Sequence, residues 1–139
     1  MHLAFDLIGV LERALEGQQK MRWESIVNAC YQYYGDHEPN WPKDLEKDLV
    51  PKYLPAFPET NLQTYGHPAS ATVEHYPFLL GTGMIDANKL RDNGHWLYDS
   101  VTKRLIIDCT HKDACGVPFS TRGGIVYSSD FGEVYDHNF

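Results

Sequence analysis

The densest group of side chains that could carry chemistry is Cys109, His111, Asp113 and Cys115, which fall within seven consecutive residues. Zinc sites commonly use a cysteine pair spaced about two to four residues apart, together with a second pair of ligands. Here five residues separate the two cysteines, and a second pair is absent from the sequence. We therefore expect a small-loop disulfide or free thiols at Cys109 and Cys115, and neither a metal nor a cofactor. A disulfide would place the protein in an oxidising compartment such as the periplasm.

Catalysis is not favoured by the surroundings of either cysteine. A catalytic cysteine needs its thiolate beside a histidine, and His75 or His95 could approach a cysteine only through the fold. No nucleophile signature surrounds the cysteines. Four acidic residues could supply a carboxylate pair for glycoside hydrolysis, a chemistry decided by their separation in space. We expect them to be solvated at strand edges instead: Glu74, Asp92, Asp99 and Asp108.

The other histidines and the glycines add no signal of an enzyme. Gly81-Thr82-Gly83 is not followed by the lysine or the third glycine that the common nucleotide-binding fingerprints require. Solvent-exposed roles are expected for three histidines in predicted loops or in the tail, namely His37, His67 and His137. The sequence therefore predicts a protein that is not an enzyme.

Length and charge narrow the class of protein further. The chain has 139 residues, a length typical of one domain with one core. Its 12 basic and 19 acidic residues give a net charge of -7, which repels nucleic acid and anionic lipid. No apolar run approaches the ~20 residues that cross a bilayer. We expect no nucleic-acid partner.

A long amphipathic helix precedes the segments that position the cysteines. No proline occurs from Leu3 to Tyr34, and apolar residues recur at helical spacing over that range. The helix is expected to end at Gly35-Asp36, because glycine readily adopts the left-handed conformation of a C-terminal cap. Within the helix, Cys30 is expected to be a buried small hydrophobe.

Prolines crowd the next segment, at positions 39, 42, 51, 55 and 58. Only one short helix fits there, from Pro42 to about Val50, with Pro42 as its first helical residue. After His67-Pro68, four runs rich in β-branched and aromatic residues predict strands. These runs are ATVEHY, GHWLYDS, RLIIDC and GGIVYSS, at residues 71–76, 94–100, 104–109 and 123–129.

The second and third runs predict a hairpin, with a turn between Ser100 and Lys103. Its alternate residues are expected to face the helix: Trp96, Tyr98, Leu105 and Ile107. The fold class is therefore α+β, with a long N-terminal α-helix packed on an antiparallel β-sheet in a single domain. We divide that domain into the helix at 1–35, a proline-rich loop at 36–68, and the sheet with a C-terminal loop at 69–139.

Three local patterns, in this order, resemble those of the type IV pilin and type II secretion pseudopilin family. Residues 33–42, YYGDHEPNWP, are similar to the family's tyrosine-ended helix, polar turn and aromatic-proline step. Residues 44–58 resemble its loop, which reads as a short helix, a Tyr-Leu pair and a proline exit. Residues 94–108 resemble its hairpin of the form GxWxYxxxTGxxxxx.

The resemblance implies a pilin-like fold and a subunit that packs its N-terminal helix into a filament core. It implies other pilin or pseudopilin subunits and the assembly machinery as partners, with membrane contact only through an anchor that this chain lacks. It also implies a location in the periplasm or at the cell surface. The loop from Cys109 to Cys115 would correspond to the disulfide-closed C-terminal region of many pilins. The calcium-binding motif of major pseudopilins is not recognisable, which favours a pilin or a minor pilin-like protein.

Filament assembly predicts apolar residues on the flank of the helix that faces away from its own sheet, and the candidates are Leu7, Val10 and Met21. The alternative is a small secreted binding module for carbohydrate or for another cell-envelope protein. That module would need an exposed aromatic platform on the sheet. An enzyme would instead need a pocket that holds a histidine next to a cysteine or a carboxylate.

Overall fold

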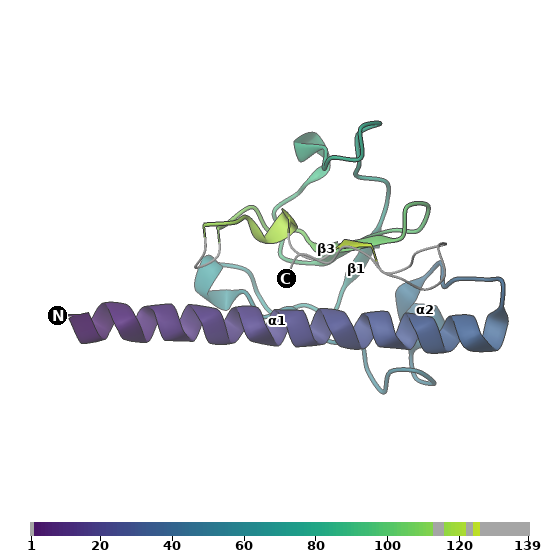
Figure 1. Cartoon of the computed structure of the whole chain (residues 1–139), viewed down its shortest axis with the longest axis horizontal. Helices are drawn as coiled ribbons and strands as arrows, with labels where there is room; N and C mark the ends of the chain where they lie inside the picture. The colour runs from purple at the N-terminus through teal and green to yellow at the C-terminus, as the bar shows by residue number, and fades with distance from the viewer. Residues whose placement is uncertain (1, 113–115, 122–123, 126–139) are drawn as a thin grey trace.

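Helix α1 (His2–His37) is the longest element of the computed structural model, and its 36 residues span about 54 Å at ~1.5 Å per residue. The structure describes residues 2–112, 116–121 and 124–125, and it describes side chains at residues 13–112 and 116–121. Figure 1 shows α1 running along one side of the molecule, with the sheet beside it. Among the described residues, none of the helices combines the length and the apolar composition needed to cross a bilayer.

The C-terminal end of α1 lies two residues beyond the predicted cap, so Gly35 is helical. The ring of His37 stacks on that of Tyr33 with centroids 4.0 Å apart, and its Nδ1 lies 2.9 Å from the Tyr33 carbonyl oxygen. These contacts hold the last turn. The helix then ends before Pro39, because the residue that precedes a proline disfavours the helical conformation.

Helix α2 (Leu45–Leu49) is shorter than predicted and begins after Asp44 rather than at Pro42. The Asp44 carboxylate accepts a hydrogen bond from the Lys47 N–H and caps the helix. Pro42 is buried instead, and its carbonyl accepts a hydrogen bond from the Tyr98 hydroxyl. The proline therefore links the loop to the sheet.

Four strands form one sheet in the order β1-β2-β3-β4. They are β1 (Val73–His75), β2 (Trp96–Asp99), β3 (Arg104–Ile107) and β4 (Gly124–Ile125). The prediction of an antiparallel sheet is wrong for one pair, because β1 and β2 are parallel, with Val73 opposite Trp96. Parallel strands need a crossover of about a dozen residues or more, and residues 76–95 supply it. The other two pairs are antiparallel, so the fold is α+β with a small mixed sheet.

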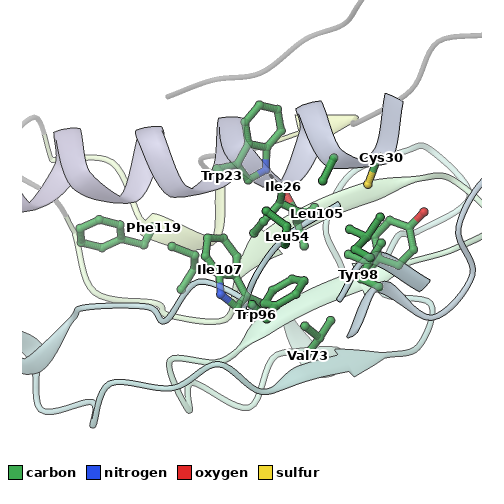
Figure 2. Packing of buried hydrophobic residues seen from close by; sticks show 14 of the residues in the cluster. Trp23, Ile26, Cys30, Leu54, Val73, Trp96, Tyr98, Leu105, Ile107 and Phe119 are labelled. Carbon is green, nitrogen blue, oxygen red and sulfur yellow. Dashed lines mark hydrogen bonds between the residues drawn. The ribbon is translucent and has the colours of Figure 1, made fainter. Parts of the chain in front are cut away.

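The main core lies between α1 and the sheet. The alternation predicted for the hairpin is confirmed, since Trp96, Tyr98, Leu105 and Ile107 are fully buried in the same cluster as Trp23, Ile26 and Cys30 of α1. Figure 2 shows these side chains pointing toward one another. The prediction for Cys30 is confirmed as well.

The intervening residues of the hairpin are also buried, although the sequence pattern did not predict it. Leu97 and Ile106 pack with Phe78 in a second cluster. The connection between β1 and β2 supplies most of that cluster, because Leu79, Ile85 and Leu90 pack against it. Apolar side chains on both faces of the hairpin are therefore removed from water.

Candidate functional site

Four potential metal-ligating side chains converge beyond the end of β3: His67, Asp92, Cys109 and His111. One ligand atom of each lies within 4.8 Å of the corresponding atoms of the other three. The four residues come from three segments, namely the loop after the 3-10 helix η1 (Gln63–Tyr65), the loop before β2, and the segment after β3. We call this set the His-Asp-Cys-His cluster.

Three distances between ligand atoms of the cluster are below 4 Å. His67 Nε2 lies 3.3 Å from Asp92 Oδ1, and His111 Nδ1 lies 3.8 Å from the same oxygen. Cys109 Sγ lies 3.5 Å from His111 Nδ1. The two residues that both the sequence analysis and the structure place together are thus Cys109 and His111. Cys109 is a buried free thiol in the structure, whereas Asp113 and Cys115 lie outside the described residues, so the Cys109–Cys115 disulfide stays a prediction.

His67 is more deeply buried than His111, the other imidazole of the cluster. Its side chain is only 8% exposed, so the prediction of a solvent-exposed histidine is wrong. The backbone of Gly94 explains this burial, since a Cβ added at Gly94 would lie 2.5 Å from His67 Cβ. Gly94 also adopts a φ of +74°, which favours glycine. Close approach of the loop before β2 therefore encloses the ring.

Asp92 is positioned by the carboxylate of Asp108, at the end of β3. That carboxylate accepts hydrogen bonds of 2.9 to 3.1 Å from the backbone N–H groups of Arg91 and Asp92. Asp108 is fully buried, so the expectation of a solvated strand-edge residue is wrong. Asp92 itself is partly exposed, and its Oδ1 accepts a 2.9 Å hydrogen bond from the Thr110 N–H. A buried acid thus fixes the loop that carries the cluster's carboxylate.

Cys109 and His111 are held by a chain reversal after β3. The N–H groups of Phe119 and Ser120, in the 3-10 helix η3 (Phe119–Thr121), donate to the carbonyl oxygens of His111 and Cys109 at 3.0 and 2.9 Å. Tyr65 lies against both sides of this reversal, with its ring 5.7 Å from that of His111 and 5.2 Å from that of Phe119. The backbone of the cluster is therefore ordered by the surrounding chain.

The local environment shifts two pKa values in opposite directions. Burial raises the pKa of Cys109 to about 11, although the hydrogen bond from the His111 backbone acts against it. Burial also acts to raise the pKa of Asp92, but the Thr110 hydrogen bond and the charges of His67 and His111 outweigh it, and the pKa falls below its usual value. A neutral thiol beside a carboxylate is the opposite of an activated cysteine nucleophile.

The other acidic residues and histidines singled out by the sequence have structural partners. Asp99 is buried, against the prediction, and its Oδ1 accepts N–H bonds from Val101 and Thr102 in the hairpin turn. Glu74 lies 3.2 Å from an Arg91 guanidinium nitrogen and 3.6 Å from His95 Nδ1. His75 Nε2 accepts a hydrogen bond from the Leu45 N–H. His37 is exposed, as predicted, and His137 lies outside the described residues.

The predicted assembly residues lie along α1. Met21 is 71% exposed, on the opposite side of the helix from the buried face. Leu7 and Val10 belong to α1, but their side chains lie outside the described residues. Positions 10 and 21 are separated by about three turns at ~3.6 residues per turn, so positions 7, 10 and 21 share one side of the helix.

The amino-acid sequence alone does not identify His67 and Asp92 as members of the cluster. They precede Cys109 by 42 and 17 residues, so no spacing rule joins them to it. The turn signal Asp92-Asn93-Gly94 marks a loop before a strand, but it does not say where that loop lies. Comparisons of the chain with protein-family models, with curated proteins and with solved structures found no match.

Proposed function

We propose that this chain is a structural subunit of a type IV pilin-like filament or secretion pseudopilus, which acts by self-association and surface display. The observation that carries the proposal is the unequal covering of α1. Among its described side chains, the first buried one is Gln19. Figure 1 shows the first turns of the helix extending beyond the rest of the described chain. A long helix whose first turns are left uncovered by the described part of the chain offers a surface to other subunits.

The side of α1 that faces away from the sheet has the composition expected of a helix-packing surface. Positions 7, 10, 14, 17 and 21 alternate steps of three and four, which places them on one stripe. Their residues are Leu, Val, Ala, Gly and Met, so the stripe is uncharged. Three of these five residues lie in the part of the helix where burial is described, and all three are exposed, namely Ala14, Gly17 and Met21. We infer that this stripe packs against helices of neighbouring subunits.

The segments that resemble pilin patterns also support the proposal. Trp41, of the aromatic-proline step, packs against the end of α1, with its ring 5.2 Å from that of Tyr31. Leu54, of the Tyr-Leu pair, is buried in the core that the hairpin residues Trp96 and Tyr98 share. The proposed partners are other pilin or pseudopilin subunits and their assembly machinery, in the periplasm or at the cell surface.

The alternative of a carbohydrate-binding module receives less support from the described side chains. Such a module needs exposed aromatic rings on its sheet. Every described Trp, Tyr and Phe side chain is buried or half-buried, and Trp96 and Tyr98 of the sheet are fully buried. The exposed large apolar residues among the described side chains are Met21, Leu80, Met84 and Val101. A filament subunit therefore accounts better for the exposed side of the helix.

Electron microscopy of the natural gene product in the cells that make it, with an antibody against this domain, tests the proposal. Met21→Glu is the variant, and Lys20→Gln is the matched control, because it changes the charge equally at the neighbouring exposed position. Burial of a methionine contributes about 1.5 to 3 kcal/mol, so Met21→Glu should weaken subunit association at least about tenfold. Labelled filaments that are reduced by Met21→Glu and retained with Lys20→Gln are the expected result. Absence of labelled filaments, or equal effects of both variants, would overturn it.

A further inference from the structure

Three of the six separations between ligand atoms of the His-Asp-Cys-His cluster are close to the edge lengths of a tetrahedron around one ion. Zinc lies about 2.0 to 2.3 Å from nitrogen, oxygen and sulfur ligands, which places tetrahedral ligands about 3.3 to 3.7 Å from one another. His67 Nε2 and Asp92 Oδ1 are 3.3 Å apart, and Cys109 Sγ and His111 Nδ1 are 3.5 Å apart. The third edge, between His111 Nδ1 and Asp92 Oδ1, is 3.8 Å. Three of the six edges therefore already have near-tetrahedral lengths.

His67 provides the second, independent observation. Its side chain is more than nine-tenths buried, and its Nε2 has no hydrogen-bond partner among the described residues. Asp92 Oδ1 is close enough to this nitrogen but does not form a hydrogen bond with it. A buried imidazole nitrogen without a hydrogen bond is costly and needs an explanation. Two ligands of one ion have this relationship, because both point at the ion rather than at each other.

We propose that His67, Asp92, Cys109 and His111 bind one Zn²⁺ ion. Two imidazole nitrogens, a carboxylate oxygen and a thiolate sulfur form a mixed set of donors that suits zinc. Four protein ligands leave no open position for a substrate, so the site is structural rather than catalytic.

The charges of the proposed site balance. Zinc displaces the thiol proton of Cys109 to solvent, and the thiolate and the Asp92 carboxylate neutralise the two positive charges of the ion. The two histidines bind as neutral imidazoles. The Thr110 N–H donates to Asp92 Oδ1, and the Asp92 N–H donates to the Asp108 carboxylate. Both bonds orient the Asp92 carboxylate, as outer hydrogen bonds commonly do around zinc.

The bound ion would join three parts of the chain that are distant in sequence. It would connect the end of the proline-rich loop at His67, the loop before β2 at Asp92, and the segment after β3 at Cys109 and His111. A structural ion binds the folded chain in preference to the unfolded chain. It therefore raises the free energy of unfolding, and at concentrations well above Kd this increase grows with the logarithm of the ratio of free ion concentration to Kd. The proposal is independent of filament assembly, so failure of either one leaves the other standing.

Zinc binding competes with the predicted disulfide, because both need the sulfur of Cys109. The experiment therefore uses the full chain reduced with a phosphine, freed of metal and then titrated with Zn²⁺ or with Co²⁺ as a spectroscopic probe. We expect one ion per chain, a rise in Tm of about 10 °C at 100-fold excess over Kd, and visible bands of tetrahedral cobalt with thiolate-to-cobalt charge transfer. Cys115→Ser should keep these signals and Cys109→Ser should remove the charge-transfer band.

His111→Gln is the decisive variant, because its imidazole is 44% exposed and its loss should leave the metal-free fold intact. His37→Gln, at an exposed histidine outside the cluster, is the matched control. We expect zinc affinity to fall at least 100-fold in His111→Gln and to be unchanged in His37→Gln, while metal-free His111→Gln melts at a temperature similar to that of the metal-free natural chain. Octahedral cobalt, equal zinc affinity in both variants, or loss of the thiolate band in Cys115→Ser instead of Cys109→Ser would overturn the proposal.

Discussion

The indole Nε1 of Trp23 donates a 2.9 Å hydrogen bond to the backbone carbonyl oxygen of Leu105, and both residues are buried. This bond joins the middle of α1 to β3 across 82 positions of sequence. It also sets the rotation of the helix about its axis. Met21, two residues before Trp23, is consequently on the far side of the helix, where its side chain is exposed.

Trp23→Phe should reduce the free energy of unfolding by about 1 to 3 kcal/mol, because the buried Leu105 carbonyl loses the hydrogen bond from the indole. Phe78→Leu is the control, since it also trims a fully buried ring but breaks no hydrogen bond. That control should cost about 1 kcal/mol. Urea denaturation followed by circular dichroism measures both. If the two variants cost the same, the hydrogen bond contributes nothing to stability.

Much of the fold could be predicted from local patterns. Helical spacing of apolar residues identified α1, and the alternation in the hairpin identified the four residues that face it, because side chains alternate strictly along a strand. The parallel pairing of β1 with β2 could not be predicted in the same way. It depends on the path of residues 76–95, which contribute Phe78 to the second apolar cluster and so bury the other face of the hairpin, for which the local pattern made no prediction.

The cluster was only partly predictable, for a related reason. Cys109 and His111 are neighbours in sequence, whereas His67 and Asp92 meet them only after three loops have folded together. Local polarity alone predicts that His67 and Asp108 are exposed to solvent. Asp108 is buried because its carboxylate accepts backbone N–H bonds from Arg91 and Asp92. His67 is buried because the bare backbone of Gly94 packs closely against it.

Gly94→Ala tests how closely the backbone of Gly94 packs against His67. The added Cβ would lie 2.5 Å from His67 Cβ, at a φ of +74°. Gly83→Ala is the matched control, since its φ is +88° and nothing lies within 4 Å of the added Cβ. Backbone strain of about 1 to 2 kcal/mol is common to both variants, so an additional loss of at least about 1 kcal/mol is expected for Gly94→Ala alone. Thermal unfolding measures the difference, and equal losses would show that the contact with His67 is not tight.

Asp108→Asn tests whether the buried carboxylate positions Asp92. An amide keeps one acceptor but directs an NH₂ group toward the Arg91 or the Asp92 N–H. Loss of about 1 to 3 kcal/mol of stability and a 10- to 100-fold loss of zinc affinity are expected. Asp99→Asn is the control, because Oδ1 alone accepts both N–H bonds of its turn and the amide retains that oxygen. Titration calorimetry with zinc should distinguish the two variants, and equal affinities would exclude a positioning role for Asp108.

Cys30 gives the fold a predictable response to alkaline pH. Burial raises the pKa of its thiol above the ordinary value, so the folded chain keeps a proton that the unfolded chain releases above about pH 8.5. The stabilising contribution is complete below the unfolded pKa and is lost as pH rises toward the folded pKa. Between pH 9 and pH 10, the advantage of the natural chain over Cys30→Ala should therefore shrink by about 1.4 kcal/mol per pH unit. Urea unfolding of both proteins at several pH values, with reductant and a chelator present, measures this. A difference that stays constant with pH would mean that Cys30 does not remain protonated in the folded chain.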